Sequence, residues 1–397
     1  MLKVSDRIAA MELSPTLAMS QKSREMRAQG IDVINLSVGE PDFDTPDHIK
    51  KAAQKAIDDN YSHYSPVPGF LELRQAVVNK LKRENGLDYT SDQIVVSNGA
   101  KQSIANAMMS IVNEGDEVII PSPFWVSYSE IVKLAEGSCV FIPTNIDQDF
   151  KITPEQLEKA ISPKTKAFLF SSPSNPTGSL YTKQELRALA DVFVKYPEIL
   201  VMSDEIYEHI NYAGAHESIA QFEDMKDRVI VINGVSKGYA MTGWRIGYIA
   251  APLWLAKACG KLQGQMTSGA SSIAQMASVA ALDGDQSSVE TMRAAFKKRR
   301  DLALAQLKEV PGFEIRKPNG AFYLFPQVKS IFGKSNGSVT INNSTDLSLY
   351  LLEYANVATV TGEAFGAPEC LRLSYATSEE QMAEAIGRIK SAIEKLI

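Results

Sequence analysis

Cysteine is scarce in this chain of 397 residues. Only Cys139, Cys259 and Cys370 are present, far apart in the sequence and in no Cys-x-x-Cys arrangement. This spacing excludes a disulfide framework and a cysteine-based zinc site. It is typical of a protein from a reducing compartment, so we expect a cytoplasmic location.

Two further kinds of site lack their sequence signals. The four histidines, His48, His63, His209 and His216, do not have ligand spacing with other metal-binding side chains, so we expect no metal. No Gly-x-Gly-x-x-Gly motif follows a strand-like run, and Gly333-Lys334-Ser335 has Val328 where a phosphate-binding P-loop needs glycine. Neither a dinucleotide fold nor a P-loop is therefore expected.

Blocks of like charge are also missing. Lys and Arg number 41 against 47 Asp and Glu, a net charge of −6, which argues against a nucleic-acid or anionic-membrane surface. The segment 262–282 has no charged residue, but its Gln, Ser, Thr and Gly make it too polar to span a membrane. We expect a loop followed by a packed helix there. Charges also interrupt the N-terminal MLKVSDRIAAMEL, so no export signal is expected.

Length predicts more than one domain. A chain of 397 residues exceeds the roughly 250–300 residues at which single cores stop growing. With 45% hydrophobic and 22% charged residues, core material is sufficient. We expect a large domain over residues 45–285 and a smaller one made of residues 1–44 together with 286–397.

Short apolar runs alternate with longer helix-patterned stretches through the predicted large domain. The strand-like runs are Ile94 to Val96, Val118 to Ile120, Ala167 to Phe170, Leu200 to Met202, Val229 to Ile232 and Tyr248 to Ala250. This alternation predicts an α/β fold with a mostly parallel sheet and helices on both faces. After residue 285, helices near 289–309 and 347–354 and strand material near 371–376 predict a smaller α+β domain.

Chemically distinct residues follow these runs directly. Gly99, Trp125, Asn175, Asp204 and Lys237 each come after a different run. One such residue alone is more often a helix cap or a packing side chain. Because ligands of open α/β sheets bind at the carboxyl ends of the strands, five of them together predict a binding site at this edge.

Lys237 is the most informative of these residues. It lies among small residues in VIVINGVSKGYAMTGWRIGY, residues 229–248, where the backbone can be approached closely and water excluded. Loss of water disfavours the ammonium form, so the neutral amine needed to attack an aldehyde becomes accessible. The alternative is an ordinary turn lysine. The neighbouring turns favour the first interpretation, with pyridoxal phosphate as the aldehyde.

A lysine-bound pyridoxal phosphate needs an anion at its ring nitrogen. Asp204, which emerges from a buried run, is suited to this position. Tyr207 and Asn175 can reach the phenolic oxygen of the ring. Trp125 can stack on the ring, although a packing role is an equally good interpretation of a lone aromatic residue.

The sequence also offers groups that can bind the cofactor phosphate and a substrate carboxylate. The segment SNGAKQ opens a predicted helix, so the backbone N–H groups of Ala100 and Lys101 can bind phosphate together with Ser236 and Arg245. In LRLSYA, Arg372 lies between apolar residues and needs an anion, which is either a substrate carboxylate or an internal salt-bridge partner. Gly39 can let the backbone approach a substrate.

Five segments match one known family in order and spacing. They are GEPDFDTP at 39–46, SNPTG at 174–178, SDEIYEH at 203–209, SKGYAMTGWRIGY at 236–248 and RLSYATSEE at 372–380. The chain thereby resembles the class I/II aminotransferases of pyridoxal phosphate fold type I, and within them the bacterial aspartate aminotransferase branch. The similarity spans nearly the whole chain.

The resemblance implies the roles of several residues. Lys237 would bind the cofactor and then move the proton between the substrate Cα and the cofactor. The substrate would meet Gly39, Lys101, Trp125, Asn175 and Arg372, with Lys101 facing its distal carboxylate. Tyr64 would reach the phosphate of the other subunit, which implies a homodimer with shared active sites.

The implied reaction moves the amino group of L-aspartate to 2-oxoglutarate, giving oxaloacetate and L-glutamate, by a ping-pong mechanism through pyridoxamine phosphate. Aromatic amino acids, alanine, prephenate or a β-elimination remain alternatives. Relatives that use prephenate carry a basic residue in the N-terminal segment, where this chain has Glu12. A regulatory protein is disfavoured, because the aminotransferase-like segment starts too early for a preceding helix-turn-helix domain.

Overall fold

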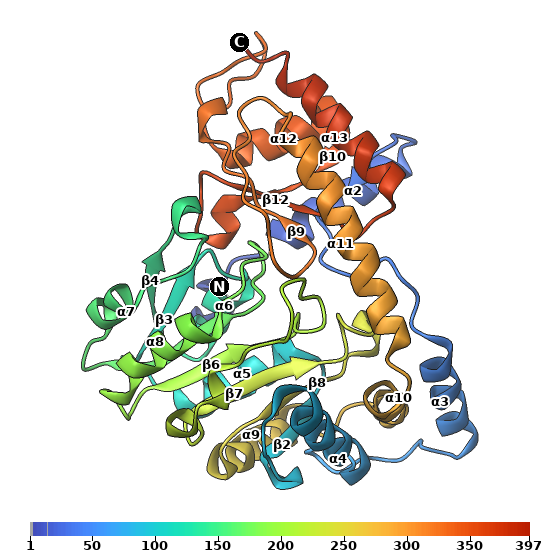
Figure 1. Cartoon of the computed structure of the whole chain (residues 1–397), viewed down its shortest axis with the longest axis vertical. Helices are drawn as coiled ribbons and strands as arrows, with labels where there is room; N and C mark the ends of the chain where they lie inside the picture. Colours follow the sequence, from blue (N-terminus) through green and yellow to red (C-terminus); the bar gives the residue numbers. More distant parts are fainter. Residues whose placement is uncertain (1–2, 14) are drawn as a thin grey trace.

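The structure, a computed structural model, describes residues 3–13 and 15–397. Its largest element is a seven-stranded sheet of order β2-β8-β7-β6-β5-β3-β4, in the lower part of Figure 1. The strands are β2 (Ile94–Ser97), β3 (Glu117–Ser122), β4 (Ser138–Pro143), β5 (Thr165–Ser171), β6 (Leu200–Asp204), β7 (Val229–Gly234) and β8 (Gly247–Ala250).

The sheet is parallel except for one strand. Strands β4, β3, β5, β6 and β7 all pair in parallel, whereas β8 is antiparallel to both of its neighbours, β7 and β2. Each of the six predicted runs forms a strand. The edge strand β4 was not predicted, because its residues are mostly partly or fully exposed and do not read as a buried run.

Helices cover both faces of this sheet, and alternate strand residues point to opposite faces. In β7, Val229 and Val231 pack into one core, and Ile230 and Ile232 into the other. The first face carries α3 (Asp47–Asp58), α4 (Leu71–Lys80), α7 (Pro154–Ala160), α8 (Lys183–Val194) and α10 (Ser272–Asp283). The second carries α5 (Ala100–Ile111), α6 (Ser127–Leu134) and α9 (Leu253–Met266). The predicted α/β class is thereby confirmed.

The C-terminal elements lie above the sheet in Figure 1 and have a core of their own. They include α11 (Ser287–Leu307), α12 (Ser344–Ala355), α13 (Glu379–Ile393), β9 (Tyr323–Leu324), β10 (Val357–Ala358), β11 (Val360–Thr361) and β12 (Leu371–Ser374). Strands β11, β12 and β9 form an antiparallel sheet.

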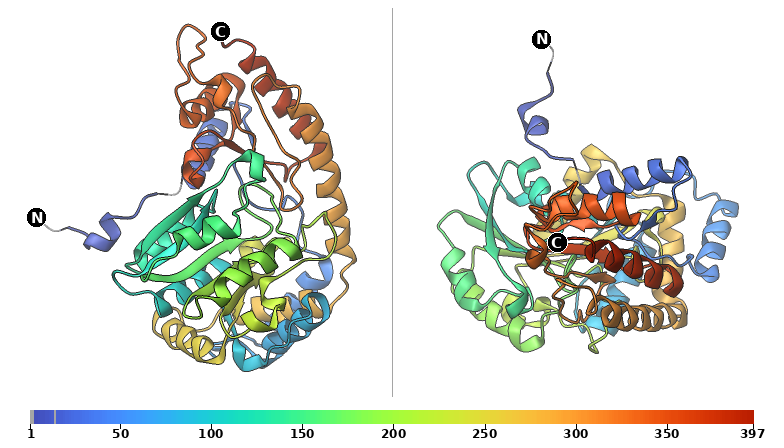
Figure 2. Two further views of the ribbon diagram at one scale, coloured as in Figure 1. Left: turned by 60° about the vertical axis from the view of Figure 1, so that its left-hand side comes forward. Right: turned by 90° about the horizontal axis from the view of Figure 1, so that it is seen from above.

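The N-terminal segment joins these C-terminal elements. Strand β1 (Ile34–Asn35) pairs in parallel with β10, and α2 (Pro15–Ala28) contacts β10 and β11. Ahead of α2, the short helix α1 (Asp6–Ala9) lies on a segment that extends outward from the body (Figure 2). The division at residues 44/45 and 285/286 stays a prediction, and residues 1, 2 and 14 of the N-terminal part lie outside the description.

The prediction of a loop and then a packed helix in segment 262–282 is confirmed for the helix, α10, but placed the start of the loop too early. Helix α9 continues to Met266, so the expected loop is confined to the few residues before α10 begins at Ser272. The continuation follows from packing, because Cys259 and Gln263 on α9 are buried against the sheet. No helix in the described ranges is long and apolar enough to cross a membrane.

Candidate active site

A cavity of about 310 Å³ opens at the carboxyl edge of the large sheet, below the C-terminal elements. It gathers all but one of the residues predicted to bind the cofactor or the substrate, namely Gly39, Ala100, Lys101, Trp125, Asn175, Asp204, Tyr207, Ser236, Lys237, Arg245 and Arg372. The exception is Tyr64, whose side chain is 98% exposed and does not line the cavity.

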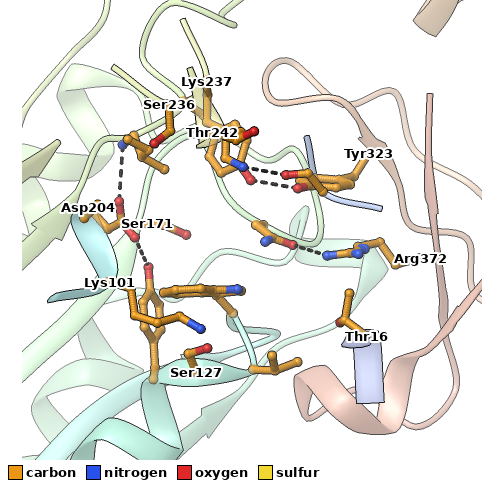
Figure 3. A pocket seen from close by; sticks show the side chains of 18 of the residues that line it. Thr16, Lys101, Ser127, Ser171, Asp204, Ser236, Lys237, Thr242, Tyr323 and Arg372 are labelled. Carbon is orange, nitrogen blue, oxygen red and sulfur yellow. Dashed lines mark hydrogen bonds between the residues drawn. The ribbon is translucent and has the colours of Figure 1, made fainter. Parts of the chain in front are cut away.

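Lys237 follows β7 in the turn that leads to β8. Its ammonium donates a hydrogen bond to the carbonyl oxygen of Gly39, so it points across the cavity toward the N-terminal segment (Figure 3). Burial lowers the pKa of Lys237 to about 8. The neutral amine that a nucleophile requires is therefore far more populated near neutral pH than in an ordinary lysine, although the ammonium form still predominates at pH 7.

Asp204 ends β6 on the cavity wall and is almost fully buried. One carboxylate oxygen, Oδ2, accepts from the Tyr128 hydroxyl at 2.7 Å, and the other, Oδ1, accepts from the Ile206 N–H at 3.2 Å. Burial raises the pKa of Asp204 to about 6, and the two donors oppose this rise. The carboxylate is therefore mostly ionised at neutral pH and can stabilise a protonated ring nitrogen.

The start of α5 forms an anion site with Arg245. The first N–H groups of a helix have no partner within it, and the N-cap residue Gly99 offers no side chain to satisfy them. Gly99 has φ +85°, and a Cβ there would lie 2.4 Å from the guanidinium of Arg245. Glycine is thus required for the arginine to lie against the helix start. Arg245 donates to the carbonyl oxygens of Thr242 and Asn98, which leaves its charge available for an anion.

Lys101 and Trp125 lie next to this anion site. The Lys101 ammonium is 5.0 Å from the centre of the Trp125 ring. Burial lowers the pKa of Lys101, and the nearby charge of Arg245 adds to the effect. Two cations close together in a partly dehydrated cavity favour an anionic ligand.

Arg372 lies on β12 at the opposite side of the cavity from Asp204 (Figure 3). It is fully buried, and it donates to the Asn175 side-chain oxygen at 3.0 Å and to the Ser37 carbonyl oxygen at 2.6 Å. Within residues 3–13 and 15–397, its Nε has no hydrogen-bond partner. The sequence left open the alternative of an internal salt bridge, but both of these acceptors are neutral. The buried guanidinium can therefore bind a carboxylate.

Two tyrosines of the cavity were not singled out from the sequence. Tyr128 bonds Asp204, and Tyr323 on β9 hydrogen-bonds the hydroxyl of Tyr207. Tyr128 follows Trp125 by three residues at a helix start, a spacing that places both on one side of the turn and could have indicated it. Tyr323 carried no comparable signal, because only the fold brings β9 beside the turn after β6.

His209 and His216 do approach carboxylates, contrary to the expectation from their spacing. His209 contacts Glu84 at 3.0 Å, and His216 contacts Glu205 at 2.9 Å. Both groups adjoin Glu208. The buried ammonium of Lys80 pairs with Glu208 and lies 3.6 Å from Glu84, so a lysine supplies the positive charge that these carboxylates need.

The cavity meets the requirements of pyridoxal phosphate. Lys237 offers the amine, Asp204 the carboxylate for a ring nitrogen, and the start of α5 with Arg245 the anion site. Arg372 is a further buried cation on this cavity, and its Nε has no partner among the residues that the structure describes. These groups lie on separate walls of one cavity, as a cofactor and a substrate bound together demand.

Comparisons with known proteins agree with this geometry. A family model described as aminotransferase class I and II matches residues 31–389. The probable aspartate/prephenate aminotransferase of Rhizobium leguminosarum bv. phaseoli is 49% identical over 392 residues, with 98% of each chain covered. The crystal structure of the Rhizobium meliloti aspartate aminotransferase matches with a TM-score of 0.97 at 43% identity and 100% coverage of both chains.

A second solved structure, the aspartate aminotransferase of Thermus thermophilus with maleate, has a TM-score of 0.93 at 40% identity. The match covers 99% of this chain and 100% of the Thermus thermophilus chain. Both the sequence and the structural matches thus extend over essentially the full length. The chain belongs to the class I and II aminotransferases and is an enzyme that depends on pyridoxal phosphate.

Proposed function

We propose that this enzyme transfers the amino group of L-aspartate to 2-oxoglutarate in two half-reactions. The observation that carries the proposal is the placement of two cationic side chains, Arg372 and Lys101, on different walls of the cavity that contains Lys237. A dicarboxylic amino acid has two carboxylates to match them. The names of the relatives, which include aspartate aminotransferases from several organisms, support the same substrate.

When bound, pyridoxal phosphate supplies an aldehyde that reacts with amines and a ring that accepts the electron pair left by Cα–H cleavage. Lys237 would hold the aldehyde carbon. Asp204 would hold the proton on the ring nitrogen, and Tyr207 and Asn175 would donate to the phenolic oxygen. Burial raises the pKa of Tyr207 well above its ordinary value, so its hydroxyl keeps the proton that it donates.

The phosphate would be bound by the N–H groups of Ala100 and Lys101 together with Ser236 and Arg245. Trp125 would lie over the ring. This assignment rests on the uncapped start of α5 and on the two carbonyl contacts that hold the Arg245 guanidinium beside it.

The substrate α-carboxylate would bind Arg372 and the Asn175 amide, near the backbone of Gly39. Lys237, once released by the incoming amine, would take the proton from the substrate Cα. Its lowered pKa, about 8, suits a group that must both accept and return a proton near neutral pH.

The assembly and location of the enzyme are further parts of the proposal. Tyr64 is exposed and does not line the cavity of its own subunit. This supports a homodimer in which Tyr64 of each subunit completes the site of the other. Residues 45–285 would hold the cofactor, and residues 1–44 with 286–397 would close over the substrate. Three free cysteines support a cytoplasmic location.

Prephenate is a second candidate amino acceptor, because several relatives are named aspartate/prephenate aminotransferases. Glu12 is exposed, and its backbone N–H bonds to Glu130. It does not line the cavity. An acidic residue in this segment offers no attraction to a second carboxylate, which favours aspartate and 2-oxoglutarate.

Half-reaction spectra test the substrate. The purified enzyme with its cofactor is mixed with aspartate, glutamate, alanine or phenylalanine, and the visible band is followed. We expect aspartate and glutamate to remove the band fastest, and Lys101→Gln to slow these two more than alanine. The aminated enzyme is then mixed with 2-oxoglutarate or prephenate. A preference for alanine or phenylalanine would contradict the substrate assignment.

Complementation tests the shared site. Lys237→Ala and Tyr64→Phe subunits are mixed after partial unfolding and allowed to reassociate. In a dimer with shared sites, half of the sites in a mixed dimer have both original residues, so activity returns above that of either parent. No gain on mixing, with mixed dimers verified by mass, would contradict the assignment of Tyr64.

A further inference from the structure

Asp204 has a side-chain partner that is itself buried in the cavity wall. Tyr128, in the first turn of α6, has a side chain that is only 1% exposed. Its hydroxyl donates a hydrogen bond to Asp204 Oδ2 at 2.7 Å. A donor to a charged carboxylate is among the stronger hydrogen bonds in proteins.

The surroundings of Asp204 explain why this donor matters. Burial raises the pKa of its carboxyl, and the charge of Glu205 adds to the rise. Tyr128, the Ile206 N–H and the Lys237 ammonium act in the opposite direction. Of these three groups, the Ile206 N–H belongs to the backbone and the Lys237 ammonium is the group assigned to the covalent chemistry. Tyr128 is thus the neutral side chain that stabilises the carboxylate.

Tyr128 also supports a second wall of the cavity. Its ring meets the Trp125 ring edge to face, with centroids 5.5 Å apart and planes at 89°. Trp125 is the residue assigned above to lie over the cofactor ring. One rigid aromatic side chain therefore contacts both the carboxylate for the ring nitrogen and the ring that covers the cofactor.

We propose that Tyr128 is a positioning residue, resting on the proposed function, which holds the Asp204 carboxylate charged and directed at the ring nitrogen of the bound cofactor. It acts through Asp204 and needs no contact with the substrate. Without its hydroxyl, the buried carboxylate loses one of two protein donors and takes up a proton more readily. A neutral acid does not stabilise a protonated pyridine.

The decisive variant is Tyr128→Phe, which keeps the aromatic packing and removes the donor. In the cofactor-free protein, carbon NMR measures the chemical shift of the Asp204 carboxyl carbon as a function of pH. The signal is assigned by its loss in Asp204→Asn. We expect its titration midpoint to move upward in Tyr128→Phe. Replacing Tyr128 by 3-fluorotyrosine keeps the ring and makes the hydroxyl a stronger donor, so the midpoint should move downward.

Cofactor binding provides the second readout. We expect Tyr128→Phe to weaken pyridoxal phosphate binding about tenfold or more at pH 8, as the loss of a hydrogen bond to a charged group implies. The matched control is Tyr181→Phe. Tyr181 is equally buried, and its hydroxyl accepts from the Ile152 N–H, away from Asp204. This control should bind the cofactor as the original protein does.

A double variant separates positioning from packing. In an Asp204→Asn background, Tyr128→Phe should cost much less affinity than it does alone, because the charged acceptor is gone. An unchanged Asp204 midpoint in both Tyr128 variants would overturn the proposal, as would an affinity loss of the same size in the Asp204→Asn background. Failure of the unaltered protein to bind pyridoxal phosphate would instead contradict the proposed function, and the NMR titration would still decide the role of Tyr128.

Discussion

The hydroxyl groups of Tyr207 and Tyr323 lie 2.7 Å apart in the wall of the cavity. Tyr207 belongs to the turn after β6, and Tyr323 to β9 among the C-terminal elements. The Tyr323 ring also lies 4.5 Å from the guanidinium carbon of Arg372. This one side chain therefore connects the residue assigned to the cofactor oxygen with the residue assigned to the substrate carboxylate.

Removal of the Tyr323 hydroxyl should affect turnover without unfolding the protein. Tyr323→Phe leaves the ring under Arg372 but removes the partner that orients the Tyr207 hydroxyl. We expect kcat/KM to fall about fivefold, the effect of one neutral hydrogen bond. Tyr350→Phe is the control, because Tyr350 is equally buried but bonds the Ala392 carbonyl far from the cavity. Equal kinetics in both variants would contradict this role.

The pKa of Lys237 predicts how the loading of the cofactor depends on pH. Only the neutral amine attacks the aldehyde, and burial lowers the pKa of Lys237 to about 8. The rate at which cofactor-free protein gains its visible band should therefore rise about tenfold per pH unit below 8 and level off above it.

Stopped-flow mixing with pyridoxal phosphate from pH 6 to 9 measures this rate. Lys237→Ala, which has no amine at this position, should show no absorbance change beyond the band of the free cofactor at any pH, and no turnover. A rate that keeps rising toward pH 10 would show that the amine titrates as an ordinary exposed lysine does.

Replacing the guanidinium of Arg372 by an ammonium group should weaken substrate binding. Arg372→Lys retains a positive charge but loses the planar pair of donors that match a carboxylate. We expect KM for aspartate to rise about 100-fold or more, with a smaller change in kcat, because bidentate contacts to a charged group are among the strongest hydrogen bonds.

Arg300→Lys is the matched control for that experiment. Arg300 is also fully buried, but it bonds Asp301 and the Pro318 carbonyl and does not line the cavity. It should lower stability and leave KM nearly unchanged. Similar KM values for the two variants would contradict the assignment of Arg372.

The buried pair of Lys80 and Glu208 predicts a large effect on stability. Lys80 is fully buried, and its ammonium also donates to Asn85 at 2.7 Å. Lys80→Met leaves the Glu208 carboxylate without its counter-charge, so we expect the free energy of unfolding to fall by about 3–5 kcal/mol. Lys82→Met is the control, because its pair with Asp88 is exposed and such pairs contribute about 1 kcal/mol or less. Urea denaturation measures both.

The same pair sets the response to acid. Burial alone would raise the pKa of Glu208, but Lys80, His209 and His216 outweigh it and hold this pKa well below its ordinary value. A carboxyl with a depressed pKa contributes stability that is complete above its unfolded pKa, about 4.3, and is lost as the pH falls further. Glu208→Gln should therefore unfold with a weaker dependence on pH below 4.5. An unchanged acid profile would contradict the role of the pair.

The strand order of the sheet could not be predicted, but its strands and the residues that follow them could. Buried β-branched runs are a local signal, and the rule that strand ends meet at one edge brought Asp204, Asn175 and Lys237 together. The reversal of β8 was not predicted. The segment between β7 and β8 lacks the helix that a parallel crossover needs, and this could have indicated it.

Contacts between distant segments could not be predicted from the sequence. Tyr323 reaches Tyr207 because β9 packs over the turn after β6, and Lys80 meets Glu208 because α4 packs on the sheet behind that turn. No periodicity or spacing encodes such pairs. Tyr128 is the exception, since its distance of three residues from Trp125 at a helix start was visible in the chain.

The antiparallel pairing of β7 with β8 has a mechanical consequence. Lys237 and Arg245 both lie in the connection between these strands, whose two ends are held together by the pairing of Gly234 with Gly247. Arg372 is attached to a different sheet. Relative movement of the two sheets would thus change the distance from Arg372 to Lys237, whereas Lys237 and Arg245 would move together because one short connection carries both.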